Sequence, residues 1–283
     1  MAGAYGKVYL VGAGPGAQDL MTLRGARLLA QADVVLHDAL VTPEMLALCP
    51  QALLIPVGKR CGQLSTAHAF INKQLIDSAA KYAVVVRLKG GDPMLFGRAD
   101  EELRALEEVG IDVEVVPGIT TALAAAAATR QPLTLRGVAR SVAFFTSSTA
   151  PAHPDCVQMP DSDTLIQYMG GREAIVTACK LLEQGRAPST PVVIVENCSR
   201  PDQRIERIDL GTLAAGLGQA SGPVLVMLGE AMAARPGQER AHEVPRGAPP
   251  LASAPGSNAN VQGNSHTDNP EPALTINRRA SQH

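Results

Sequence analysis

The stretch VYLVGAGPG, residues 8–16, joins a short apolar run directly to a glycine-rich turn. A short apolar run that ends in Gly and Pro is typical of a buried strand. In an α/β fold, the turn at the carboxyl end of such a strand is a common place for ligands to bind. The turn is not the dinucleotide fingerprint G-x-G-x-x-G, because its third glycine comes one residue early and Pro15 has no backbone N–H for a phosphate. On this segment alone, a structural turn and a ligand-binding turn are both open.

Strand and helix signals alternate along the rest of the chain. Further β-branched runs predict strands at 34–36, 53–57, 84–88 and 113–116, and then near 142–145, 165–168, 192–195 and 224–228. Amphipathic spacing predicts helices at 20–30, 66–81, 100–109 and 120–129. This alternation is the signature of an α/β fold with a mostly parallel sheet. A break after Gln131-Pro132 predicts two α/β domains, an N-terminal one at 1–133 and a C-terminal one at 134–235.

Composition excludes several classes of function. Of 283 residues 46% are hydrophobic, which is enough to build substantial cores. Lys and Arg number 25 against 27 Asp and Glu, so no overall positive field draws the chain to nucleic acid or to an anionic membrane. Only 3% of residues are aromatic and there is no Trp, which leaves few side chains for base stacking. We therefore expect neither nucleic acid nor a membrane as a partner.

The pattern of apolar residues and the spacing of the cysteines bear on the cellular location and on metal binding. No window has the 18 or so uninterrupted apolar residues of a membrane span, and the N-terminus opens on a strand instead of a signal sequence. The five cysteines form no C-x-x-C pair and have no matching His spacing. The sequence thus predicts a cytoplasmic protein with no metal site.

The C-terminal segment 236–283 has a different composition from the rest of the chain. It is rich in Pro, Gly, Ser and Asn, has no aromatic residue and shows neither a helical nor a strand period. Such composition is typical of disorder, so we expect a disordered tail without a role of its own.

Polar residues follow several of the expected strands. Asp38 ends the second one, where a ribose-binding carboxylate, a general base and an ordinary turn or helix cap are all consistent with it. Lys59 follows the third, although solvated lysines are the norm. The sequence Gly90-Gly91-Asp92 follows the fourth and is more specific, because adjacent glycines let a ligand approach the backbone and a carboxylate accepts hydrogen bonds. Arg98 and Glu101 lie three residues apart, which also fits a plain surface ion pair.

Charge is unevenly distributed in the middle of the chain. Residues 115–154 contain no Asp or Glu but include Arg130, Arg136 and Arg140. A locally basic stretch in a mildly acidic protein indicates an anionic small molecule, either a carboxylate or a phosphate. Just before it, Thr120 and Thr121 begin a helix, where free N–H groups and hydroxyls are available to a ligand.

Taken together, a collinear set of motifs covering about residues 5–230 resembles the tetrapyrrole methylases. They are VYLVGAGPG at 8–16, VLHD at 35–38, VGKR at 57–60, RLKGGDP at 87–93, FGR at 96–98, VPGIT at 116–120, LRGVA at 135–139, YMG at 168–170 and TPV at 190–192. The resemblance implies two α/β domains with S-adenosylmethionine in the cleft between them and a homodimer. It also implies two successive methylations of uroporphyrinogen III to precorrin-2, for sirohaem or cobalamin biosynthesis.

The resemblance also implies roles for individual residues. The family's methyl-donor contacts fall on Pro15, Gly90, Gly91, Asp92, Leu95, Thr120, Thr121, Met169 and Cys198. Its catalytic positions fall on Asp38 as proton acceptor, Lys59 as proton donor, and Arg98, Glu101 and Arg136 as the substrate-handling cluster.

This chain departs from the family pattern at clustered positions. They are Leu64, His68, Ala99-Asp100, Leu135, Thr146-Ser147-Ser148 and Cys198. The donor-side motifs are largely intact, so a related methylase that acts on another acceptor, such as a later corrin precursor, is the alternative. A binding module without turnover and a nicotinamide-dependent oxidoreductase are the other classes considered, and the spacing of the first turn disfavours the latter.

Overall fold

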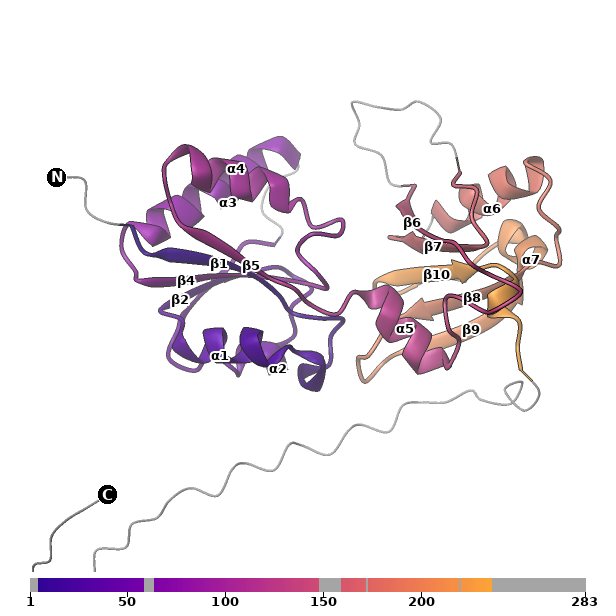
Figure 1. Cartoon of the computed structure of the whole chain (residues 1–283), viewed down its shortest axis with the longest axis horizontal. Coiled ribbons are helices and arrows are strands. Elements are labelled where there is room, and N and C mark those ends of the chain that lie inside the picture. The colour runs from indigo at the N-terminus through magenta and orange to yellow at the C-terminus, as the bar shows by residue number, and fades with distance from the viewer. Residues whose placement is uncertain (1–4, 59–63, 148–158, 172, 219, 236–283) are drawn as a thin grey trace, which may run out of the picture. The chain divides into compact units, whose positions relative to one another are not determined.

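The protein is described here by a computed structural model that covers residues 5–58, 64–147, 159–171, 173–218 and 220–235, with only the backbone for 64–68 (Figure 1). Both β-sheets belong to the part Met1–Ala248. The predicted tail at 236–283 lies outside the described residues.

The first sheet is wholly parallel, in agreement with the mostly parallel sheet that the sequence predicts. Its strands are β1 (Lys7–Gly12), β2 (Val34–His37), β3 (Leu53–Pro56), β4 (Val84–Lys89) and β5 (Val113–Val116), in the order β3-β2-β4-β1-β5. The connecting segments contain η1 (Gln18–Leu20), α1 (Leu23–Gln31), α2 (Pro43–Leu46), α3 (Leu64–Ala79) and α4 (Ala99–Glu108). Helices α1 and α2 cover one face of the sheet, and α3 and α4 cover the other (Figure 1).

Alternating side chains of these strands fill two cores. Val34 and Leu36 of β2 pack in the cluster that contains Leu75 of α3, whereas Val35 packs in the cluster that contains Leu29 of α1. All five side chains are fully buried. Because both faces of a parallel sheet are covered, its strands appear in the sequence as continuous apolar runs, which is why they are easily predicted.

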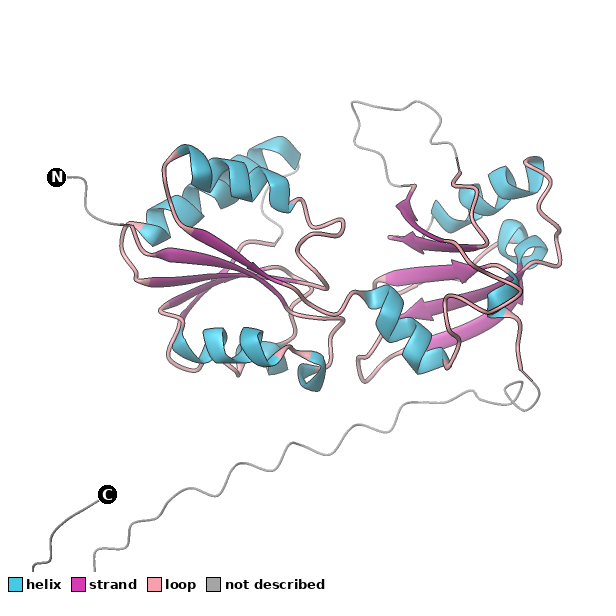
Figure 2. Cartoon of the chain, in the orientation of Figure 1, coloured by secondary structure: helices cyan, strands magenta, loops and turns pink. Residues whose placement is uncertain are grey.

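The second sheet is mixed, which differs from the mostly parallel sheet that the alternation suggested. Its strands are β6 (Val142–Thr146), β7 (Thr164–Tyr168), β8 (Pro191–Glu196), β9 (Arg204–Asp209) and β10 (Val224–Leu228), in the order β6-β7-β10-β8-β9. Only β6 and β7 pair in parallel, and the other pairs are antiparallel. The accompanying helices are α5 (Thr121–Thr129), α6 (Glu173–Glu183), α7 (Leu210–Ala215) and η2 (Glu230–Met232), as Figure 2 shows.

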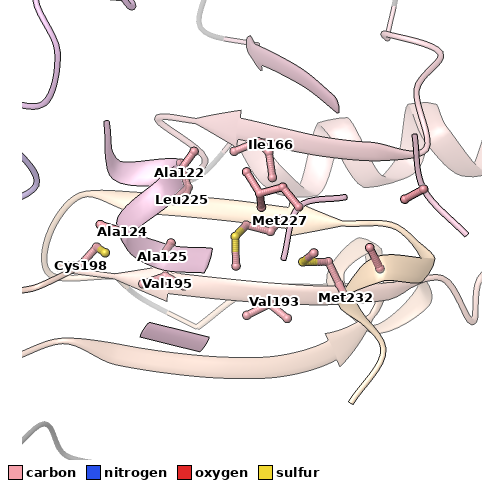
Figure 3. Close-up of a cluster of buried hydrophobic side chains, with 13 residues drawn as sticks. Ala122, Ala124, Ala125, Ile166, Val193, Val195, Cys198, Leu225, Met227 and Met232 are labelled. Atoms are coloured by element: carbon pink, nitrogen blue, oxygen red, sulfur yellow. The ribbon is translucent and has the colours of Figure 1, made fainter. Parts of the chain in front are cut away.

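Helix α5 packs on the second sheet. Its buried alanines, Ala122, Ala124 and Ala125, lie in one core cluster with Val193 of β8 and Met227 of β10 (Figure 3). Alanine side chains are small, so the helix can lie close to the strands. The core of the second sheet therefore begins before residue 133, and a domain boundary at 133/134, like the ligand cleft between the domains, stays a prediction.

Within the residues that the structure covers, no helix has both the length and the hydrophobicity to cross a membrane.

Candidate active site

Three loops that the sequence predicts to bind a ligand lie together at the carboxyl edge of the first sheet. In the parallel register, Gly12 of β1 is level with Lys89 of β4, and Val11 is level with Val116 of β5. The loops that follow these strands, at 13–16, 90–92 and 117–120, therefore leave the sheet side by side. This edge is where parallel α/β sheets hold their ligands.

Glycines allow these loops to touch through their backbones. Gly14 and Gly91 exchange hydrogen bonds, with N···O distances of 3.1 Å and 2.8 Å. A Cβ on Gly118 would come within 2.3 Å of the Gly91 carbonyl oxygen, and one on Gly12 would come within 2.6 Å of the Gly118 Cα. Since both obstacles are backbone atoms, no side chain fits at Gly12 or Gly118. Gly91 itself has φ +68° and open space where a Cβ would lie, so a ligand can approach its backbone there.

Asp92 ties two of the loops together. Its Oδ1 accepts from the N–H of Met94 at 2.8 Å, and its Oδ2 accepts from the N–H of Gly118 at 2.9 Å. The carboxylate is partly exposed. Each oxygen retains a second lone pair, so the carboxylate can also accept from a ligand hydroxyl or ammonium group.

Thr120 caps α5 beside the end of β7. The Tyr168 hydroxyl lies 2.5 Å from Thr120 Oγ1 and accepts from the N–H of Ala122 at 3.2 Å. Burial raises the pKa of Tyr168, so the hydroxyl stays protonated near neutral pH. The ring of Phe96 lies 5.0 Å from that of Tyr168. These contacts place Thr120, on the loop that follows β5, against β7 of the second sheet.

Two predicted donor contacts from the second sheet have opposite environments. Met169 has φ 56° and is 53% exposed, so its thioether is available to a ligand. The Cys198 thiol instead lies in the core with α5, 4% exposed, and burial raises its pKa to about 11 (Figure 3). Its neighbour Ser199 accepts from the Ala17 N–H at 3.0 Å, beside the first glycine turn. Any contact between Cys198 and a ligand would therefore involve its backbone.

The remaining predicted donor contacts lie in or beside the same loops. Gly90 follows β4 directly, Thr121 is the first residue of α5, Pro15 is buried in the first turn and Leu95 is half-buried in the loop before α4. The structure thus brings most of the predicted donor set to one edge of the first sheet.

Asp38 lies at the same edge, at the end of β2, and is bound by an arginine that the sequence analysis missed. Arg87 Nη2 donates to Asp38 Oδ1 at 2.5 Å. Behind it, Glu102 accepts from Arg87 and from Lys89 at 2.9 Å and 2.8 Å. Charged residues within strands and helices usually face solvent, so nothing in the sequence points directly to this group. The apolar run on either side of Arg87 is the one clue, because it predicts a strand buried on both faces.

The substrate-handling residues are exposed. Arg98 and Glu101 form a bidentate pair at 2.7 Å and 2.9 Å, with the side chains 43% and 41% exposed. Arg98 has φ 54° at the N-cap of α4. Arg136 is exposed in a turn that the Leu135–Ala139 bridge closes. Lys59, the predicted proton donor, lies outside the described residues.

Among the departures from the family pattern, Ser147 has a defined place. Its hydroxyl accepts from Gln167 Nε2 at 3.1 Å and lies 2.7 Å from the hydroxyl of Thr177. It therefore contributes to a polar cluster between β7 and α6. Leu135 is 40% exposed in the turn that carries Arg136, and Ser148 lies outside the described residues.

Comparison with known proteins connects this arrangement to a family. The family model described as tetrapyrrole (corrin/porphyrin) methylases matches residues 7–214. A uroporphyrinogen-III C-methyltransferase from Pseudomonas aeruginosa is 43% identical over 80% of this chain and 94% of its own length. A sirohaem synthase from Azotobacter vinelandii is 42% identical, but the chain spans only 51% of its length.

A solved structure has a similar fold. The crystal structure of uroporphyrin-III C-methyltransferase from Thermus thermophilus, complexed with S-adenosylhomocysteine, superposes with a TM-score of 0.70 at 40% identity. The match covers 80% of this chain and 93% of that one. We conclude that the chain belongs to the tetrapyrrole methylase family, because the family model and these similarities agree with the parallel sheet and with the glycine loops at its edge.

Proposed function

We propose that the protein is an S-adenosylmethionine-dependent C-methyltransferase that methylates uroporphyrinogen III twice, through precorrin-1, to give precorrin-2. The observation that carries the proposal is the convergence of the Gly14, Gly91 and Gly118 loops, fastened by Asp92, at the edge of the parallel sheet. Membership of the family and the 43% identity to a uroporphyrinogen-III C-methyltransferase support it. The product would serve sirohaem biosynthesis, and cobalamin biosynthesis is a second outlet for it.

The loop edge has the chemistry to hold S-adenosylmethionine. Open space beside Gly91 admits a ligand to the backbone, Asp92 offers carboxylate oxygens to a ribose hydroxyl or an ammonium group, and Met169 supplies an exposed apolar contact. When bound, S-adenosylmethionine supplies an electrophilic methyl group on its sulfonium. The protein's own contribution is to fix the position of the donor and exclude water from it.

The acceptor is a carboxylate-rich, reduced tetrapyrrole, and we assign Arg136 to bind it. Arg98 is already paired with Glu101, which reduces its net attraction for a further anion. Arg136 is exposed in the acid-free stretch 115–154. A guanidinium binds a carboxylate through two parallel N–H bonds, which orients the ligand as well as attracting it.

Asp38 would accept a hydrogen bond or a proton from the pyrrole that receives the methyl group. It lies at the same sheet edge as the donor loops and is partly exposed. General-base assistance contributes about 10²–10⁴-fold, whereas positioning of the reactants can lower the barrier by about 7–11 kcal/mol. Positioning by the arginines and loops is therefore expected to matter at least as much as Asp38, and Lys59 stays the predicted proton donor.

The finer assignments are part of the same proposal. A homodimer and a cytoplasmic location accord with the family resemblance, and the five cysteines, which form no C-x-x-C pair, accord with a reducing compartment. The partner is the small-molecule tetrapyrrole, and the near-neutral charge of the chain argues against nucleic acid.

Replacement of Arg136 tests the acceptor side of the proposal. Arg136→Ala removes a charge-assisted hydrogen bond worth about 1.5–3 kcal/mol, which corresponds to a rise in KM for uroporphyrinogen III of about 10- to 150-fold. Binding of S-adenosylhomocysteine, measured by calorimetry, should stay within about twofold of wild type because Arg136 lies outside the donor loops.

Arg27→Ala, which removes an exposed arginine of α1, is the matched control and should leave both quantities unchanged. An unchanged KM in Arg136→Ala would contradict the assigned role of the basic stretch. Loss of S-adenosylhomocysteine binding would instead place Arg136 in the donor site.

A further inference from the structure

Four charged side chains form one connected group at the carboxyl edge of the first sheet. Arg87 and Lys89 come from β4, Glu102 from α4, and Asp38 follows β2. Glu102 is 0% exposed, Arg87 is 3% exposed and Lys89 is 4% exposed, while Asp38 is 30% exposed. The group therefore runs from a fully buried carboxylate to one that reaches the ligand edge.

The buried part of the group has its charges and donors satisfied. Two cations face two carboxylates, and Arg87 uses each of its nitrogens: Nε binds Glu102, Nη1 binds the carbonyls of Leu36 and Leu88, and Nη2 binds Asp38. Burial alone would lower the pKa of Arg87, but Asp38 and Glu102 raise it. The guanidinium is therefore permanently charged and is held from several directions.

Lys89 has the opposite balance. Burial lowers its pKa, the neighbouring Arg87 lowers it further, and Glu102 opposes both. Its ammonium donates to Glu102 Oε2, the oxygen that Arg87 does not use. Glu102 thus holds both cations, one on each oxygen, and is the fixed centre of the group.

Isolated buried ion pairs are weak contributors to stability, because desolvation offsets much of their attraction. A hydrophobic residue at each of these positions would fill the space without that cost. The position of Asp38 at the exposed end of the group suggests why charged residues are used instead. Arg87 holds Oδ1 of Asp38, whereas Oδ2 has no partner among the side chains that the structure describes and Asp38 is partly exposed.

We propose that Glu102 and Arg87 are positioning residues, which hold the Asp38 carboxylate through Oδ1 so that Oδ2 faces the tetrapyrrole during methyl transfer. The inference rests on the proposed function, since it concerns the orientation of the group assigned to the acceptor. Neither residue touches the ligand. Both act only through Asp38, and this distinguishes positioning from a general contribution to folding.

A double-mutant cycle between Glu102 and Asp38 tests this dependence. Glu102→Gln keeps the shape of the side chain but removes the charge that fixes Arg87. We expect kcat for uroporphyrinogen III to fall about tenfold or more, while the affinity for S-adenosylhomocysteine and the KM for S-adenosylmethionine stay within about twofold. In an Asp38→Asn background, adding Glu102→Gln should cause almost no further loss of kcat.

The control is Glu108→Gln, which neutralises an exposed acid at the end of the same helix. It should behave as wild type in every assay. If Glu102→Gln fails to bind S-adenosylhomocysteine, so that the fold is in doubt, Arg87→Lys enters the same cycle. A lysine keeps the buried positive charge, but its ammonium cannot span Glu102 and Asp38 as the guanidinium does.

Two results would overturn the inference. One is a Glu102→Gln or Arg87→Lys enzyme with kcat within about twofold of wild type. The other is an additive cycle, in which the second substitution slows Asp38→Asn by the same factor as it slows wild type. Failure of the proposed function looks different, because the wild-type protein itself would then bind S-adenosylhomocysteine without methylating uroporphyrinogen III.

Discussion

At the scale of single residues, Asp92 shows how a ligand motif also organises its own surroundings. Its carboxylate binds N–H groups of two separate loops, those of Met94 and Gly118. Gly12 and Gly118 are glycine because backbone atoms occupy the space of a Cβ. Asp92, a predicted donor contact, therefore also holds two loops together, which prearranges the site before a ligand binds.

Cys198 gives a prediction about pH. Burial raises its pKa from 9.0 to about 11, so between these values the unfolded chain releases the thiol proton while the folded chain keeps it. The folded state then binds more protons than the unfolded state, and the free energy of unfolding falls as the pH rises from 9.0 to about 11. The slope is at most about 1.4 kcal/mol per pH unit.

Denaturant unfolding of wild type and Cys198→Ala between about pH 8 and about pH 10.5 measures this effect. Cys198→Ala should lose less stability over that interval than wild type, while Cys179→Ala, at an exposed position, should follow wild type. Parallel curves for wild type and Cys198→Ala would show that the thiol is not buried as described.

At the scale of elements, α5 links the ligand edge of the first sheet to the core of the second. Its N-cap residue, Thr120, ends the loop after β5, and its buried alanines share a core cluster with residues of β8 and β10. A sequence of consecutive alanines has almost no amphipathic signal, so the sequence could predict a helix there but not the sheet that it covers. In the structure, the buried alanines identify the face of α5 that contacts the second sheet.

Enlarging a buried alanine tests the packing of α5. Ala125→Leu inserts three extra carbons where Ala125 is fully buried, and overpacking of this kind costs about 1–3 kcal/mol. Ala127→Leu, on the exposed side of the same helix, should change the free energy of unfolding by no more than about 0.5 kcal/mol. Urea denaturation compares the two variants, and equal stabilities would mean that α5 does not bury the face described here.

At the scale of the whole molecule, the sequence predicts the first sheet well and the second less well. The expected strands at 34–36 and 113–116 match β2 and β5 closely. Strand β2 is a buried apolar run, and β5 is β-branched at three of its four residues, and both features are typical of strands. Strand β9 was missed. At the edge of the sheet, its residues Arg204–Asp209 include four charged side chains, and its two isoleucines, Ile205 and Ile208, lie three residues apart. That spacing is also typical of a surface loop or a short helix.

The same contrast holds for the candidate site. The glycine turns and Asp92 were predictable, because Gly and Asp directly after an apolar run are typical of a turn at the end of a strand. The Arg87–Glu102 pair was not, because its partners lie 15 residues apart on a strand and a helix and only the folded chain shows that both are buried. The resemblance to a family assigns roles to positions but says nothing about how a carboxylate such as Asp38 is held.

A chain that ends at Arg235 should fold and unfold as the full chain does. The family model matches only residues 7–214, and the composition of 236–283 is typical of disorder. Removal of 236–283 is therefore expected to leave the melting temperature and the rate of methyl transfer unchanged. Calorimetry and the turnover assay check this, and a clear loss of either would give the segment a role in the enzyme.

We propose that this chain transfers methyl groups from S-adenosylmethionine to uroporphyrinogen III. The most direct test is anaerobic incubation of the purified protein with S-adenosylmethionine and freshly reduced uroporphyrinogen III, followed by mass analysis of the tetrapyrrole. We predict a product with two added methyl groups and a matching yield of S-adenosylhomocysteine. Binding of S-adenosylhomocysteine with no methylated tetrapyrrole would contradict it.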